Sequence, residues 1–133
     1  RGLGDVYKRQ ELGLSYLFIT HNISVVAYLA HEVAVMYLGR IVEYGDVEKV
    51  LNSPLHPYTT ALLSAVPVPD PDHQREVIRL EGDMPSPINP PSGCHFHPRC
   101  PHAQPICRER YPQTVQSEDG TRVACWLHET ERR

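Results

Sequence analysis

Four cysteines are the residues of this sequence with the clearest capacity for chemistry. They are Cys94, Cys100, Cys107 and Cys125, in the spacing C-x5-C-x6-C-x17-C, and the 133-residue chain has no others. Four thiolates can bind a metal centre. Four unrelated buried thiols would need a large apolar core, which the polar and proline-rich segments between them do not supply. The cysteine spacing therefore indicates a metal-binding module.

Three kinds of site remain open for these cysteines. An iron–sulfur cluster ranks first, because a cubane separates its iron atoms and so tolerates long, uneven spacings. Zinc ranks second, because structural zinc sites usually draw ligands from C-x2-C or C-x4-C pairs, which the chain lacks. A disulfide ranks third, because it needs an oxidising compartment and no signal-peptide pattern opens the sequence. The apolar side chains that could shield a centre are Phe96, Ile106, Val123 and Trp126. The nearby histidines are interpreted as surface groups or as partners of the ligands: His95, His97, His102 and His128.

His21 is the second candidate. It follows a short apolar run over residues 14–20 and precedes a helical apolar period over residues 23–30. The run predicts a strand buried on both faces of a parallel sheet, and Asn22 or Thr20 could cap the helix. His21 would then stand at the carboxyl end of a strand, where ligands bind in open α/β sheets, and could contact a phosphate oxygen or orient a water. A capping or core histidine is the commoner role. The other histidines are interpreted as structural or exposed: His31, His56 and His73.

The middle of the chain predicts small elements that would position these residues. Two strand-like runs, 32–38 and 40–44, flank Gly39 at hairpin spacing. Residues 46–51 predict a short helix capped by its first residue, and residues 58–66 predict a second helix after a proline. These elements belong to the part of the chain that contains His21.

Proline divides the chain into two parts. All thirteen prolines lie between Pro54 and Pro112, and seven of them fall in residues 67–93. That segment is predicted to be an extended arm, with a possible short strand at 77–80. We expect five segments: a non-native or disordered leader (1–10), the end of an α/β domain (11–53), a helix with the proline-rich arm (54–93), a Cys-rich tail (94–128) and a charged terminus (129–133).

Composition and missing motifs exclude several classes of function. The net charge is -3 and the lysines are Lys8 and Lys49, so no basic stripe is available for nucleic acid. The apolar runs fall short of the ~20 residues that span a bilayer. The sequence contains no G-x-x-x-x-G-K-[ST] loop and no nucleophile elbow, so the chain alone is not expected to hydrolyse ATP.

Three motifs resemble a known family. Residues 17–22 (LFITHN) and 33–45 (VAVMYLGRIVEYG) resemble the last part of the nucleotide-binding domain of ABC transporters. Residues 54–59 (PLHPYT) narrow the resemblance to the ATP-binding subunits of oligopeptide and dipeptide importers. The tail, with GCHFHPRC over 93–100 and the last two cysteines, looks like the C-terminal extension of that subfamily. The resemblance covers about residues 11–128.

The resemblance implies roles for the candidate residues. His21 matches the switch histidine, which senses the terminal phosphate of ATP bound with Mg²⁺ between two facing domains. Asn22 stands where members more often carry Asp. The four cysteines match the ligands of a [4Fe-4S] cluster, with zinc as the alternative that the spacing leaves open.

The implied fold class is α/β: the C-terminal part of a P-loop ABC nucleotide-binding domain, followed by a proline-rich arm and a small Cys-rich metal-binding tail. The family's phosphate loop, glutamine loop, signature motif and magnesium-binding segment precede the position of residue 14, and none occurs in this sequence. We therefore expect the chain to be the C-terminal part of a longer subunit.

The resemblance also implies partners. The intact subunit would hydrolyse ATP to drive import of small peptides, or of nickel complexes, at the cytoplasmic face of the inner or plasma membrane. It would pair with a second ATP-binding subunit and two transmembrane permease subunits, and indirectly with an extracytoplasmic peptide-binding protein. The alternative is a stand-alone metal-binding interaction module, with an iron–sulfur cluster or zinc and no ATPase activity.

Overall fold

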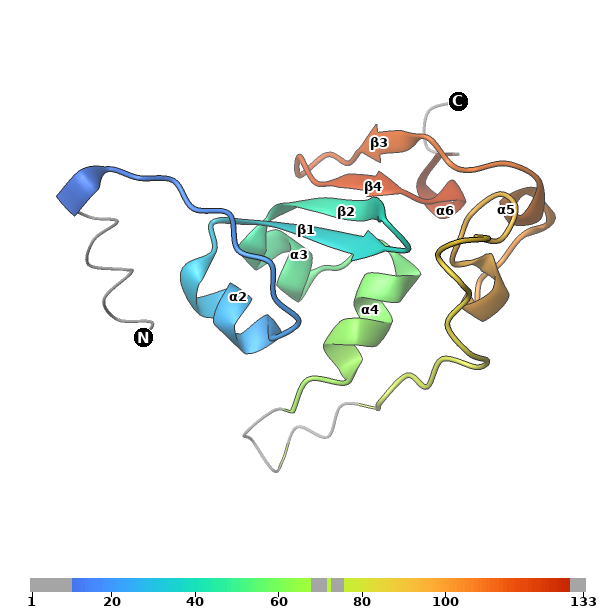
Figure 1. Cartoon of the computed structure of the whole chain (residues 1–133), viewed down its shortest axis with the longest axis horizontal. Coiled ribbons are helices and arrows are strands. Elements are labelled where there is room, and N and C mark those ends of the chain that lie inside the picture. The colour runs from blue at the N-terminus through green and yellow to red at the C-terminus, as the bar shows by residue number, and fades with distance from the viewer. Residues whose placement is uncertain (1–10, 68–71, 73–75, 130–133) are drawn as a thin grey trace.

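The computed structural model describes residues 11–67, 72 and 76–129. A four-stranded antiparallel sheet, in the order β1-β2-β4-β3, forms its centre. The strands are β1 (Glu32–Tyr37), β2 (Arg40–Asp46), β3 (Thr114–Gln116) and β4 (Arg122–Ala124). Beneath the sheet in Figure 1 lie α2 (Ile23–Leu29), α3 (Val47–Asn52) and α4 (Pro57–Ser64). At the other end of the sheet from α2 lie α5 (Pro105–Glu109), preceded by the 3-10 helix η1 (His97–Arg99), and α6 (Trp126–Glu129).

The predicted hairpin is confirmed. Strands β1 and β2 pair antiparallel, with Tyr37 opposite Arg40 at the turn. Leu38 (φ 46°) and Gly39 (φ 77°) both have positive φ. Two central residues with positive φ give a turn whose twist matches that of the flanking strands. The hairpin therefore fixes the register of the strands that carry the core.

The predicted helices are also confirmed, and each begins at a side-chain cap. The Asn22 side chain accepts hydrogen bonds from the first turn of α2, and the Asp46 side chain does the same for α3. Helix α4 begins at Pro57, where the missing N–H costs no hydrogen bond, and it ends two residues before the predicted end. The short polar caps satisfy backbone N–H groups that have no partner within a helix.

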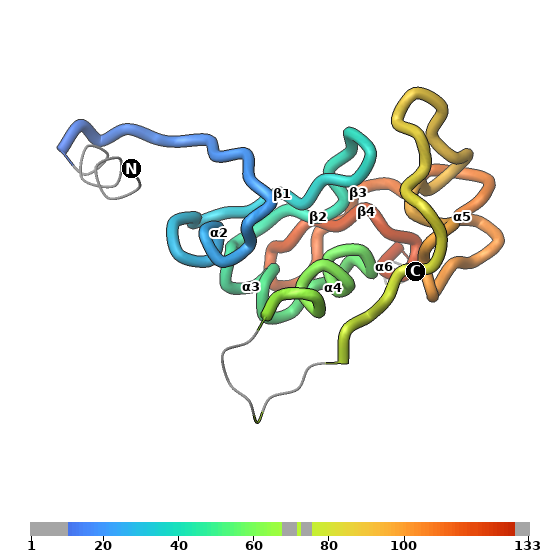
Figure 2. Tube along the Cα trace, turned by 60° about the horizontal axis from the view of Figure 1, so that its bottom comes forward, coloured from blue at the N-terminus to red at the C-terminus, as the bar shows by residue number. Residues whose placement is uncertain are grey.

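Two predicted strands are wrong. Residues 14–20 and 77–80 form neither helix nor strand, and every residue of 14–20 is exposed. A buried parallel strand needs neighbouring strands at both edges, and no segment within the described residues pairs with 14–20. Figures 1 and 2 show this segment (blue) running away from the sheet. The observed sheet is therefore antiparallel, not the parallel sheet expected.

The Cys-rich tail contributes half of this sheet, which the sequence analysis did not predict. Strand β4 pairs with β2 through Glu43 opposite Val123 and Tyr44 opposite Arg122. Val123 is only 1% exposed. Residues 76–93 contain no helix or strand, and Figure 2 shows them passing from the helical side of the molecule to the end that holds α5. The tail thus packs onto the hairpin instead of standing apart from it.

No helix within the described ranges is long and apolar enough to cross a membrane. The expected leader (1–10) lies outside those ranges. So do part of the arm (68–71 and 73–75) and the end of the charged terminus (130–133).

Candidate functional site

The structure brings the four cysteines into one region around α5. The backbone N–H of Cys94 donates to the carbonyl of Cys107 over 2.8 Å, which joins the loop before η1 to α5. Cys125 follows β4 directly, and β4 pairs with β2. Burial raises the pKa of the Cys125 thiol to about 11, and the nearby Cys94, Cys100 and Cys107 thiols add to the rise.

The thiols pack against an aromatic core. Tyr37, Val42 and Phe96 form this core, and Cys94 and Cys100 lie against it. Phe96 is 1% exposed, and its ring centroid lies 5.2 Å from that of Tyr37. Of the side chains expected to shield a centre, Phe96 and Val123 are buried, whereas Ile106 and Trp126 are half-buried.

The thiols are close without converging on one point. Within the described ranges, no group of three or more His, Cys, Asp or Glu side chains is arranged to hold a metal ion. Burial also raises the pKa of Cys94 and of Cys100, so these thiols stay protonated at neutral pH when no metal is bound. Metal binding would have to displace those protons.

The histidines around the cysteines have varied surroundings. His97 is half-buried, and its Nδ1 lies 2.8 Å from the Cys94 carbonyl oxygen. His128 Nε2 lies 2.9 Å from the Leu55 carbonyl oxygen, which connects α6 to the segment before α4. The Nδ1 atom of His95 is buried without a hydrogen-bond partner in the part of the chain that the structure describes. His102 is exposed.

A buried carboxylate holds the start of α4, and the sequence analysis missed it. Glu43 is 0% exposed, and its two carboxylate oxygens accept hydrogen bonds from the N–H groups of Leu55 (2.9 Å) and His56 (3.0 Å). His56 is 1% exposed, and its Nδ1 accepts from the Tyr58 N–H at 3.0 Å, which caps α4. The only signal for Glu43 was its position within a strand between apolar neighbours. His56 is structural, as expected, whereas His73 lies outside the described residues.

Acid is expected to destabilise the chain through His56. Burial, and then the charge of His128, lowers the pKa of His56 from 6.5 to about 4. The unfolded chain binds the proton more readily, so the stabilisation is present above pH 6.5 and is lost as the pH falls through 4. The free energy of unfolding should fall by roughly 3 kcal/mol across that window. Denaturant titrations at a series of pH values measure this fall.

His56→Asn is the matched variant, because Asn can still cap α4 but does not titrate. Its free energy of unfolding should be lower at neutral pH, since it leaves part of the ring's space empty, and should change less between pH 6.5 and 4. An equally steep fall in the variant would contradict the assignment to His56.

His21 lies in a different place from the one expected. It is exposed, because no strand precedes it. With Asn22 it lines a pocket of about 400 Å³ whose other wall is formed by Leu62 of α4 and by Ala65 and Val66, which follow that helix. The pocket is lined by residues at the start of α2 and near the end of α4, whereas Cys107 lies in α5; Figure 1 shows α2 and α5 at opposite ends of the sheet. The structure therefore does not unite the two candidate sites.

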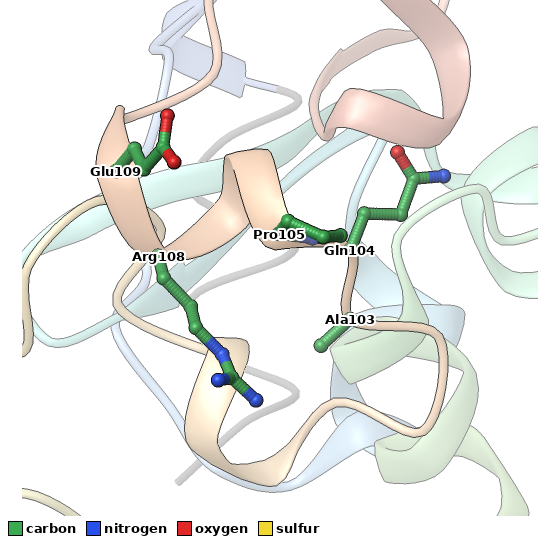
Figure 3. Close-up of a pocket in the computed structure, with 5 residues that line it drawn as sticks. All are labelled: Ala103, Gln104, Pro105, Arg108 and Glu109. Carbon is green, nitrogen blue, oxygen red and sulfur yellow. The ribbon is translucent and has the colours of Figure 1, made fainter.

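A second pocket, of about 380 Å³, lies on α5 (Figure 3). Its lining residues are Ala103, Gln104, Pro105, Arg108 and Glu109. All five are exposed, and none is a predicted site residue. In Figure 3 the Arg108 and Glu109 side chains point away from each other. No buried polar group lines this pocket, so it carries no chemistry that we can assign.

Comparisons with known proteins agree on one family. The family described as "Oligopeptide/dipeptide transporter, C-terminal region" matches residues 42–107. The dipeptide transport ATP-binding protein DppF of Haemophilus influenzae is 54% identical over 118 residues, which are 89% of this chain and 36% of that protein. DppF of Escherichia coli is 52% identical over 118 residues, 89% of this chain and 35% of that protein. The oligopeptide transport ATP-binding protein OppF of Salmonella typhimurium is 54% identical over 106 residues, 78% of this chain and 32% of that protein.

The chain spans about a third of the length of these curated relatives. Their names give no support to the stand-alone metal-binding module. The match within residues 42–107 includes most of the hairpin strand β2, the cap of α4 and three of the cysteines. The chain therefore carries the C-terminal region of the oligopeptide/dipeptide transporter family, and it is similar to dipeptide and oligopeptide transport ATP-binding proteins.

Proposed function

We propose that this chain is the C-terminal part of an ATP-binding subunit of an ABC importer, which couples ATP hydrolysis to the uptake of dipeptides or oligopeptides. The observation that carries the proposal is the match of residues 42–107 to the transporter C-terminal region, together with 54% identity to a dipeptide transport ATP-binding protein. The phosphate-binding loop is absent from these 133 residues, so turnover of ATP and Mg²⁺ is assigned to the intact subunit.

The partners follow from the same proposal. The intact subunit works at the cytoplasmic face of the membrane with a second ATP-binding subunit and two permease subunits. An extracytoplasmic peptide-binding protein delivers the peptide to the permease pair. The subunit is peripheral to the membrane.

His21 is proposed as the residue that senses the terminal phosphate of ATP. Its exposure beside the α2 cap leaves the imidazole free to meet a nucleotide bound by other parts of the subunit. A neutral imidazole can donate a hydrogen bond to a phosphate oxygen or orient the attacking water. Phosphoryl transfer depends on such positioning, because the protein does little covalent chemistry in this reaction.

The four cysteines are proposed to bind a [4Fe-4S] cluster rather than zinc. The spacing C-x5-C-x6-C-x17-C, which contains no C-x2-C or C-x4-C pair, favours a cluster with separate iron atoms over one tetrahedral zinc. The aromatic core beneath Cys94 and Cys100 would exclude water from one side of the cluster. The cluster would join α5, η1 and the end of β4, and so serve as a structural staple.

A transplant tests the transport function. Residues 11–133 replace the matching region of DppF in Haemophilus influenzae cells that lack their own DppF. We expect dipeptide uptake to return. His21→Gln within the same transplant should abolish uptake, whereas His102→Gln, a change at an exposed histidine, should leave it intact. A transplant that accumulates to normal levels without restoring uptake would refute the proposed function.

Metal analysis tests the cofactor. The chain is purified without oxygen, and iron, acid-labile sulfide and zinc are measured per chain together with the visible spectrum. We expect about four irons and four sulfides with a broad cluster absorption, as for a [4Fe-4S] centre. Cys125→Ser should lose most of this iron, and Ser117→Ala, in the turn between β3 and β4, should keep it. One zinc per chain without iron would overturn the cluster and leave the transport function untouched.

A further inference from the structure

The end of α4 and the turn that carries His21 line one pocket. Its volume is about 400 Å³, with His21 and the start of α2 on one side and Leu62 and Val66 on the other. The backbone is still helical at Ala65, so Leu62 and Val66, four residues apart, lie on one side of the helix end. Both are half-buried, whereas His21 is exposed. The imidazole therefore has an aliphatic wall opposite it.

Polar contacts hold the backbone around His21 but not its ring. The Asn22 N–H donates to the Thr20 hydroxyl at 3.1 Å, and the Asn22 side chain caps α2. From the residues that the structure describes, no hydrogen bond or ion pair reaches the imidazole. The wall formed by α4 is therefore the surface of another element that can restrict how the His21 ring is oriented.

Helix α4 is fastened at both ends, so this wall has a fixed support. At the start of the helix, Glu43 accepts the N–H of His56, and the His56 ring caps the first turn. At the end, the Ser64 hydroxyl donates to the Ala61 carbonyl at 2.7 Å and accepts the Ile78 N–H at 3.0 Å. Side chains on a packed helix hold their places more precisely than side chains on a loop.

The two sides of the pocket belong to different parts of the chain. The match to the transporter C-terminal region covers residues 42–107, which include α4 and exclude His21. We propose that this C-terminal region positions His21 for the terminal phosphate of ATP in the intact subunit, with Leu62 and Val66 as the positioning residues. The inference rests on the role proposed above for His21. It gives the C-terminal region a part in ATP hydrolysis.

The expected effect is on the rate of hydrolysis and not on ATP binding. In hydrolysis a water oxygen bonds to the terminal phosphorus as the bond to ADP breaks, and a proton is released to solvent. A His21 ring that turns away spends less time in the productive position, and small misplacements can cost about 100-fold in rate. Leu62→Ala removes part of the wall, so kcat should fall about tenfold. The KM for ATP should stay the same, as for an interaction made only in the transition state.

The test measures ATP hydrolysis by the transplanted subunit described above, assembled in the complete importer. Leu62→Met keeps the volume of the side chain, so its kcat should stay close to that of the wild type. Leu80→Ala is the matched control for Leu62→Ala, because Leu80 is also half-buried but packs against the aromatic core and does not line the pocket. It should lower the unfolding temperature by a similar amount and leave kcat unchanged.

The outcomes separate this inference from the proposed function. No hydrolysis by the wild-type transplant, or hydrolysis that His21→Gln leaves unchanged, would overturn the proposed function and this inference with it. A loss in His21→Gln together with an unchanged kcat in Leu62→Ala would overturn this inference alone. Equal losses of kcat in Leu62→Ala and Leu80→Ala would also overturn it, because they would reflect stability and not the pocket. If Leu62→Ala fails to accumulate, Val66→Ala decides, since it removes fewer atoms.

Discussion

Gly93→Ala is expected to lower the free energy of unfolding by about 3 kcal/mol and to impair metal loading. Gly93 has a φ of 67°, and a Cβ atom there would lie 2.3 Å from the Cys107 carbonyl oxygen and 2.8 Å from the Arg108 carbonyl carbon. Both are backbone atoms of α5, so no side chain can move aside. Relief of the clash would break the bond from Cys94 N–H to Cys107 and separate two cysteines.

Gly82→Ala is the matched control for this substitution. Gly82 has a φ of 76°, and nothing lies within 4 Å of the position a Cβ would take. Only the strain of positive φ remains, so this variant should lose about 1 kcal/mol. Denaturant unfolding of both variants, with iron measured per chain, separates the clash from the strain. Equal losses in the two variants would show that contact with α5 does not matter.

Glu43→Ala should be the second large effect, with a loss of about 4 kcal/mol in the free energy of unfolding. The Glu43 carboxylate accepts hydrogen bonds from the N–H groups of Leu55 and His56. In the variant, both N–H groups would be left without this acceptor. Each unpaired buried donor costs about 1–3 kcal/mol. Hydrogen exchange of these two amides should accelerate far more than that of β1. The start of α4 would loosen.

Two further variants make this result specific. Glu43→Gln keeps the shape and one acceptor oxygen, so it should lose about half as much. Glu118→Ala removes an exposed carboxylate and should change the free energy of unfolding by less than about 0.5 kcal/mol. Similar losses of unfolding free energy in all three variants would contradict the stabilising role of the Glu43 hydrogen bonds.

Local elements followed from the sequence because their signals are local. Gly39 between two strand-like runs predicts a hairpin, and the turn has the positive φ values that favour such a residue. Asn22, Asp46 and Pro57 predict helix starts, since a cap or a proline acts within one turn. The spacing of the cysteines singled out the region that forms around α5.

The predictions that were wrong or missing concern strands, because a strand depends on a partner strand that can lie far away in the sequence. Residues 14–20 have the composition of a buried strand, but a strand exists only when another strand accepts its hydrogen bonds. None does so within the described residues, and the segment is exposed. The pairing of β4 with β2 was missed for the opposite reason. This pairing places Glu43 opposite Val123, with about 80 residues between them in the chain. The sequence of neither strand indicates which strand it pairs with.

By itself, the sequence determined the hairpin, the helix starts, the set of four thiols and the resemblance to the importer subunits. Each of these depends only on residue types and on residues that are close together in the sequence. Only the tertiary structure decided that the tail completes the sheet and that Glu43 and His56 are buried together. The physical reason is that burial and hydrogen-bond partnership depend on segments far apart in the chain, which meet only when the backbone has folded.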